Sequence, residues 1–205
     1  MKKRSIAKLV VLGMVTATML TGINVQAKGE KVVTAMTSID LTPELCDPVK
    51  SGPDFRLYEM IYDPLVRYGE NGEIEPALAE SWKISEDGTT YTFHLRKDVK
   101  FSDGTVFNAD NVIWNYNRWV EQEVTGNFSA KLESVTKVDD YTVEFKFAES
   151  CYTLLIEFSY PRPFRFTCES ALDEDGEFYQ EVGTGMWMID SYESGQEVVL
   201  VPNPN

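Results

Sequence analysis

The chain has few of the residues on which hydrolytic and metal-dependent catalysis depend. Its 205 residues include one histidine and three cysteines. A Ser-His-Asp triad needs an imidazole beside its nucleophile, but His94 falls at a polar-face position of a predicted strand. No G-x-S-x-G, phosphate-loop or dinucleotide-binding pattern is present, and no C-x-x-C pair marks a zinc site. The sequence therefore gives an enzyme little support.

Basic residues are also scarce. There are 19 Lys and Arg against 33 Asp and Glu, a formal net charge of −14. An acidic surface repels nucleic acid and anionic membranes, so neither is expected as a partner. The many carboxylates leave a secreted carbohydrate hydrolase open as an alternative, because glycoside hydrolysis needs only a pair of acids.

The first 27 residues predict a secretory signal peptide. They combine basic residues at the start, an apolar run interrupted by threonines, and the ending Val25-Gln26-Ala27. No cysteine near this ending offers a lipid attachment point. We expect the mature chain to begin near Lys28 outside the cytoplasm, in the periplasm or its equivalent. It would carry 15 basic and 33 acidic residues, a charge of −18.

The three cysteines, Cys46, Cys151 and Cys168, would then enter a compartment that allows disulfides. At most one bridge can form, which leaves an odd thiol, and the sequence does not decide the pairing.

The pattern of apolar residues predicts a mixed α+β fold without strict strand-helix alternation. Alternating Tyr91, Phe93 and Leu95 predict a strand with one buried face. Asn108 precedes a helix whose expected apolar stripe is Val112, Ile113, Tyr116, Trp119 and Val120. Further elements are a strand at 31–39, a helix from 54 that Pro64 interrupts, a strand at 141–147, a short helix at 151–159 and two strands within 186–201.

Residues 159–166 read SYPRPFRF, an unusual concentration of rings, prolines and arginines in an acidic chain. Prolines restrict the backbone, so Arg162 between two of them loses less freedom when it forms an ion pair. Its guanidinium fork suits a carboxylate ligand. The alternative is structural: Arg165 and Arg162 would pair with acidic side chains across a domain junction.

Residues 62–118 contain, in order, PLV, LAESW, SEDG, TYTFHLRKDVKFSDG and an N-A-D helix start, and residues 182–205 contain GTGMW and a strand pair. This sequence resembles the family-5 extracytoplasmic solute-binding proteins of ABC importers. The resemblance implies a class II periplasmic-binding-protein-like fold of two lobes. It implies that 28–68 begin lobe I, 69–159 form an inserted α+β domain and 160–205 return to lobe I. We expect the second lobe to be absent from this chain, which would then be an N-terminal part.

Within the family, YPRPFRF at 160–166 is similar to the segment of nickel-binding members. That implies that Arg162 holds the carboxylate of a small chelator carrying the metal, with Phe55, Phe128 and Tyr160 as walls and no direct metal ligand. It also implies a non-catalytic monomer with no cofactor of its own, whose partner is the membrane permease of an ABC importer. Phe55 replaces an expected methionine, and Met186 replaces the proline of GTGPW. Peptide binding, or a truncated fragment that binds nothing, stay as alternatives.

Overall fold

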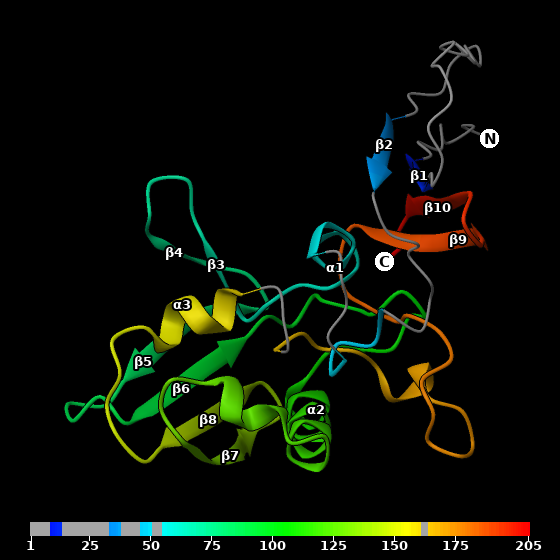
Figure 1. Ribbon diagram of the computed structural model, residues 1–205. Helices are drawn as coiled ribbons and strands as arrows, with labels where there is room; N and C mark the ends of the chain where they lie inside the picture. The colour runs from blue at the N-terminus through cyan, green and yellow to red at the C-terminus, as the bar shows by residue number, and fades with distance from the viewer. Residues whose placement is uncertain (1–8, 14–32, 38–45, 51–54, 161–163) are drawn as a thin grey trace.

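The computed structural model describes residues 9–13, 33–37, 46–50, 55–160 and 164–205, with the side chains of 46–50, 57–160 and 164–205 (Figure 1). Within them the chain forms two four-stranded sheets and a two-stranded hairpin, with helices packed against them. No helix of the described part has the length and apolarity needed to cross a membrane. The α+β class predicted from the sequence is confirmed.

The fully antiparallel four-stranded sheet has the order β5 (Ala79–Ile84), β6 (Thr90–Leu95), β8 (Thr142–Phe147), β7 (Leu132–Asp139). The predicted alternation is confirmed, since Tyr91, Phe93 and Leu95 of β6 are buried. Helix α3 (Leu154–Ser159) covers this apolar face. The Phe158 ring of α3 lies 5.0 Å from that of Phe93, and T-shaped contacts of this kind add about 0.5–1.5 kcal/mol beyond area burial.

Helix α2 (Ala109–Glu121) begins where the sequence predicts it. The Asn108 side chain accepts hydrogen bonds from the backbone N–H groups of Asp110 and Asn111, and the Asn111 side chain accepts from the Asn108 backbone N–H. This capping box satisfies N–H groups that have no partner inside the helix. The predicted stripe differs at one position: Val120 is 48% exposed, and Asn115 is buried in its place.

Helix α1 (Phe55–Ile61) ends before Pro64, and a hairpin of β3 (Val66–Tyr68) and β4 (Ile74–Pro76) follows. The two DGT triplets form tight turns in which Gly88 and Gly104 take positive φ angles of 70° and 90°. Two short 3₁₀ helices, η2 (Val124–Asn127) and η3 (Glu169–Ala171), complete the helical elements of the described residues.

The second four-stranded sheet has the order β2 (Val33–Thr37), β1 (Leu9–Gly13), β10 (Glu197–Pro202), β9 (Trp187–Glu193). β1 runs parallel to β2 and antiparallel to β10. Since β1 lies inside the predicted signal peptide, cleavage after Ala27 would remove it and free the facing edges of β2 and β10. The signal peptide and the domain boundaries at 68/69 and 159/160 stay predictions.

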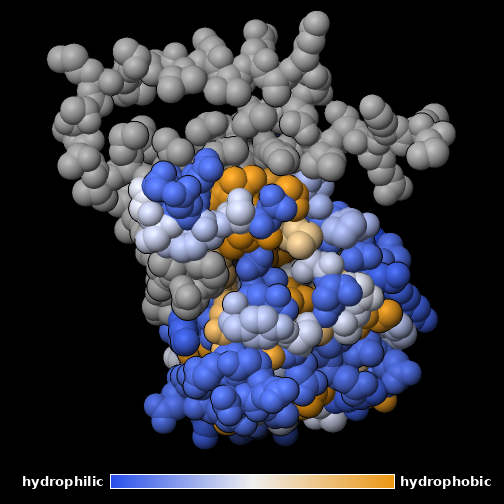
Figure 2. Space-filling view, turned by 90° about the vertical axis from the view of Figure 1, so that its right-hand side faces the viewer, coloured by the Kyte–Doolittle hydropathy of each residue, from blue (hydrophilic) through white to orange (hydrophobic). Residues whose placement is uncertain are grey.

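The face drawn in Figure 2 is largely hydrophilic, as the acidic composition predicts, with hydrophobic side chains gathered beside the grey residues. β9 and β10 carry half-buried apolar side chains, among them Met188, Val199 and Val201. Cys46 and Cys168 are buried, and Cys151 is partly exposed.

Candidate ligand-binding site

Phe164, Arg165 and Phe166 fix the backbone on the C-terminal side of residues 161–163. All three side chains are buried, with exposed fractions of 2% or less. Arg165 donates hydrogen bonds to the backbone carbonyls of Ser159, at 3.0 Å, and Tyr160. These carbonyls lie at the C-terminal end of α3, where a cation is favourable. Arg165 therefore ties the two flanks of 161–163 together.

Burial lowers the pKa of Arg165 from its usual high value to about 10, and the carboxylates of Glu59 and Asp63 oppose the shift. The side chain is still a cation at neutral pH. The sequence left open a pairing of Arg165 with acidic side chains. Its hydrogen bonds go to backbone carbonyls instead, and the two carboxylates act on it through their electrostatic field.

An aromatic cluster holds Phe164 in place. Its ring stacks on that of Phe128, with centroids 3.6 Å apart and planes 12° from parallel. Trp119 of α2 contacts both Phe164, at 5.3 Å, and Phe166, at 5.4 Å. The T-shaped and tilted contacts of Trp119 are arrangements that aromatic rings prefer. The cluster joins the 164–166 segment to α2 and to the chain after η2.

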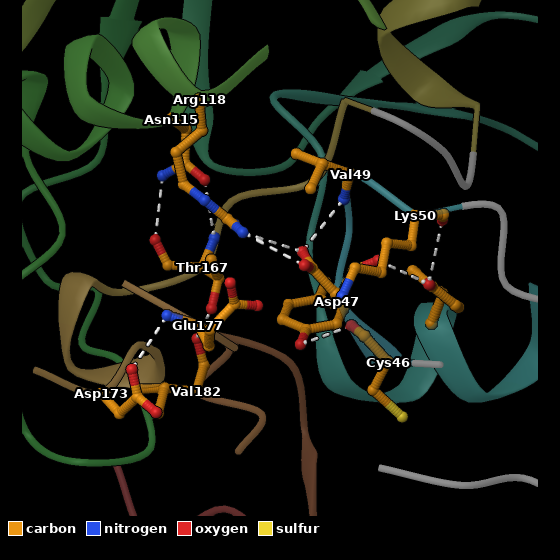
Figure 3. A network of polar contacts seen from close by, with 12 residues as sticks. Cys46, Asp47, Val49, Lys50, Asn115, Arg118, Thr167, Asp173, Glu177 and Val182 are labelled. Atoms are coloured by element: carbon orange, nitrogen blue, oxygen red, sulfur yellow. Dashed lines mark hydrogen bonds and ion pairs between the residues drawn. The ribbon is translucent and has the colours of Figure 1, made fainter. Parts of the chain in front are cut away.

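A turn at residues 46–50 is held to α2 by an ion pair between Asp47 and Arg118 (Figure 3). Asp47 is 1% exposed, and its two carboxylate oxygens accept hydrogen bonds from Nη2 of Arg118 at 3.2 and 3.1 Å. Its Oδ1 also accepts from the Val49 backbone N–H at 3.2 Å. Removing one partner of a buried ion pair costs about 3–5 kcal/mol, because the other charge is left without compensation. The pair therefore fixes the turn firmly.

Two tyrosines hold the same turn by hydrogen bonds: Tyr58 lies in α1, and Tyr62 directly follows the helix. The Tyr58 hydroxyl donates to the Asp47 carbonyl at 2.8 Å, and the Tyr62 hydroxyl donates to the Cys46 carbonyl at 2.9 Å. Burial raises the pKa of Tyr62 well above its usual 10.0, with the Cys46 thiol and Glu181 adding to the shift. The Tyr62 hydroxyl thus stays a neutral donor.

Asn115, one turn before Arg118 on α2, holds the segment that follows Phe166. Its amide nitrogen donates to the Thr167 carbonyl at 2.9 Å, and its amide oxygen accepts from the Thr167 backbone N–H at 3.1 Å. The Thr167 hydroxyl donates onward to the Val182 carbonyl at 3.0 Å. Figure 3 shows these contacts beside the Asp47–Arg118 pair.

The GTG triplet at 183–185 is a packing feature of this region. A Cβ on Gly183 would lie 2.0 Å from the Ile61 carbonyl oxygen, and one on Gly185 would lie 2.4 Å from that of Met60. Only glycine allows this approach to the end of α1. Met186, at the position where the family resemblance leads one to expect proline, is 78% exposed.

The structure describes the side chains of two of the four predicted site residues, Phe128 and Tyr160. Arg162 lies outside the described residues, and so does the Phe55 side chain. Tyr160 is 56% exposed. Phe128 is only 6% exposed, and its ring faces the aromatic cluster. The Phe128 ring lies 5.1 Å from that of Phe158, near the C-terminal end of α3, and Tyr160 directly follows this helix. The contact of Phe128 and Tyr160 with a ligand stays a prediction.

Sequence reasoning missed Asp47, Asn115 and Arg118. Asn115 carried a weak signal, because it occupies a position between apolar residues of the α2 stripe. Asp47 and Arg118 are 71 residues apart, and a single sequence shows no sign of such a pairing.

A hollow elsewhere on the molecule is poorly suited to a ligand. One of about 250 Å³ is lined by Asp63, Arg67, Arg96 and Asp98 among others, but these four side chains already form two ion pairs. In the part of the chain that the structure describes, no three His, Cys, Asp or Glu side chains gather to hold a metal ion.

Comparison with known proteins decides the family. The model of the bacterial extracellular solute-binding proteins, family 5, matches residues 73–205 in its middle region. The chain belongs to this family. Its members are transport solute-binding proteins rather than enzymes, and the structure corresponds to part of one lobe of their two-lobed fold.

Three similar proteins illustrate the range of the family. The nickel-binding periplasmic protein of Escherichia coli K12 is 35% identical over 158 residues, which cover 71% of this chain and 29% of that protein. The probable D,D-dipeptide-binding periplasmic protein DdpA of the same organism is 33% identical over 178 residues, covering 80% and 34%. The crystal structure of NikA from Brucella suis with Fe(III)-EDTA matches with 34% identity and a TM-score of 0.74, covering 81% and 34%. The chain thus spans about a third of the length of these relatives.

Proposed function

We propose that this family-5 protein is the extracytoplasmic binding component of an ABC importer and binds nickel as a complex with a small carboxylate-bearing chelator. The observation that carries the proposal is the 35% identity to the E. coli nickel-binding periplasmic protein, together with the YPRPFRF segment. Export would use residues 1–27, which places the protein where a membrane permease can receive the ligand.

Arg162 is the proposed anchor of the chelator. Its two flanks are held in place by Arg165, which binds the Ser159 and Tyr160 carbonyls, and by Phe164 on Phe128. Fixed flanks lower the entropy that the loop loses on binding. Charge-assisted, two-pronged hydrogen bonds to a carboxylate would then supply affinity and orientation. Phe55, Phe128 and Tyr160 are the proposed walls, with no protein atom bound directly to the metal.

The permease partner would distinguish the open from the closed form of the binding protein. A ligand that binds better between closed lobes shifts the population toward the closed form, and this form is the one that a permease can select. No catalytic step is involved. The monomeric state is part of the proposal.

Peptide binding is the second candidate. The dipeptide-binding relative DdpA matches a larger share of this chain, 80% against 71% for the nickel-binding relative. A peptide offers a terminal carboxylate as a chelator does, so Arg162 would serve either ligand.

Replacing Arg162 by alanine tests the anchor. In the exported protein with any continuation that its gene encodes, Arg162→Ala should weaken binding of Ni²⁺ with L-histidine by roughly 1.5–3 kcal/mol, the range for a hydrogen bond to a charged group. Calorimetric titration measures this loss. Arg67→Ala is the matched control, because Arg67 is an exposed arginine paired with Asp63. Unchanged affinity in Arg162→Ala would refute the assignment.

A further inference from the structure

Helix α2 holds two segments that come from distant parts of the chain. Arg118 binds the 46–50 turn through Asp47, and Asn115 binds the 164–167 segment through Thr167 (Figure 3). The two side chains are three positions apart, so they project from the same side of the helix. Each contact spans more than 50 residues of sequence, 71 for Asp47–Arg118 and 52 for Asn115–Thr167.

The Asp47–Arg118 pair is the stronger of the two attachments. Asp47 is almost fully buried. Among the described residues, Arg118 is the cation that donates hydrogen bonds to its carboxylate. Both carboxylate oxygens of Asp47 accept hydrogen bonds from Nη2 of Arg118. The Arg118 guanidinium also lies 5.4 Å from the centre of the Trp114 ring. Neutralising either partner leaves a buried charge, so the turn would have to rearrange.

One of the two segments that α2 holds, residues 164–167, borders the proposed ligand-binding region. Thr167 follows the Phe164–Arg165–Phe166 anchor directly, and that anchor fixes the flanks of Arg162. We infer that Asp47 and Arg118 are positioning residues for ligand binding: through α2 they keep the 46–50 turn and the 164–167 segment in one arrangement. Ligand affinity then depends on a pair that does not itself contact the ligand. This inference rests on the proposed function.

The test uses the complete exported protein and two probes, Ni²⁺ with L-histidine and a dipeptide. The variants are Asp47→Asn, Arg118→Gln and their combination, whose two amides can hydrogen-bond without charge. Val143→Ala is the control, because Val143 is a fully buried residue of β8 and its loss destabilises the core without changing either segment. Dissociation constants are measured at a temperature where every variant is folded. Backbone amide exchange is followed at Val49 and Thr167.

Each single variant should weaken binding of the preferred probe about tenfold, a size typical of residues that act through others. Amide exchange should rise at both Val49 and Thr167 in Arg118→Gln, since α2 couples the two segments. The double variant should recover part of the lost affinity, and Val143→Ala should bind as the wild type does. Wild-type affinity in both single variants, with faster exchange at Val49, would make the pair purely structural and overturn the inference.

Failure of the proposed function gives a different result. In that case the wild type binds neither probe, so no positioning role exists for these ligands. The coupling itself is then judged by exchange alone. A rise at both Val49 and Thr167 in Arg118→Gln supports it, and a rise confined to Val49 contradicts it.

Discussion

Glu181 shows how a single buried polar group ties stability to pH. Its Oε1 accepts a hydrogen bond from the backbone N–H of Ile189, a residue of β9, at 3.0 Å. Burial raises the pKa of Glu181 above the usual 4.5, and the backbone hydrogen bonds offset the shift only in part. The native state therefore binds this proton more tightly than the unfolded state. Its stabilising contribution is complete below 4.5 and is lost as the pH rises through the folded-state pKa.

Glu181→Gln should remove this dependence. The amide keeps an oxygen for the Ile189 N–H but cannot ionise, so the variant should be more stable than the wild type at neutral pH. Below 4.5 the two proteins should be nearly equal. Urea unfolding across this range measures the difference, with the exposed Glu174→Gln as control. A constant difference at every pH would show that Glu181 titrates normally.

At the scale of elements, local signals predicted part of the regular structure, whereas β1 and β7 were not predicted. Asn108 predicted the start of α2 and the alternation around Phe93 predicted β6, because capping and side-chain periodicity depend on neighbours in sequence. Tertiary packing decided the rest. Asn115 is buried and Val120 exposed because Asn115 bonds Thr167, a contact that no local pattern contains. The Asp47–Arg118 pair and the stacking of the Phe128 ring on Phe164 are likewise tertiary contacts that no local pattern contains.

The capping box gives the prediction at this scale. Asn108→Ala removes the acceptor for the N–H groups of Asp110 and Asn111, so it should lower the free energy of unfolding by about 1 kcal/mol. Asn117→Ala is the control, since Asn117 is exposed on the same helix and alanine favours helix. Chemical denaturation compares the two. Equal stability of Asn108→Ala and the wild type would mean that the cap contributes nothing.

At the scale of the whole molecule, the family was predictable from long, ordered sequence patterns, whereas the ligand was not. The matched region begins at residue 73 and includes the β5–β6–β8–β7 sheet and the β9–β10 pair. Much of this region is scaffold, such as the buried rings of β6 and β8 and the glycines packed on α1. The nickel-binding relative and the probable D,D-dipeptide-binding relative are similar to this chain to nearly the same extent, at 35% and 33% identity. In the proposed function, ligand choice depends on a few side chains, and two of these, Arg162 and the Phe55 side chain, lie outside the described part.

The most direct test of the proposed function is a calorimetric titration of the complete exported protein with three ligands: Ni²⁺ with L-histidine, Ni²⁺ alone, and a dipeptide. The proposal predicts saturable binding of the nickel–histidine complex and much weaker binding of the bare ion, because the chelator's carboxylate and not the metal contacts Arg162. Saturable binding of the dipeptide with no response to nickel–histidine would contradict the proposal and establish the peptide alternative.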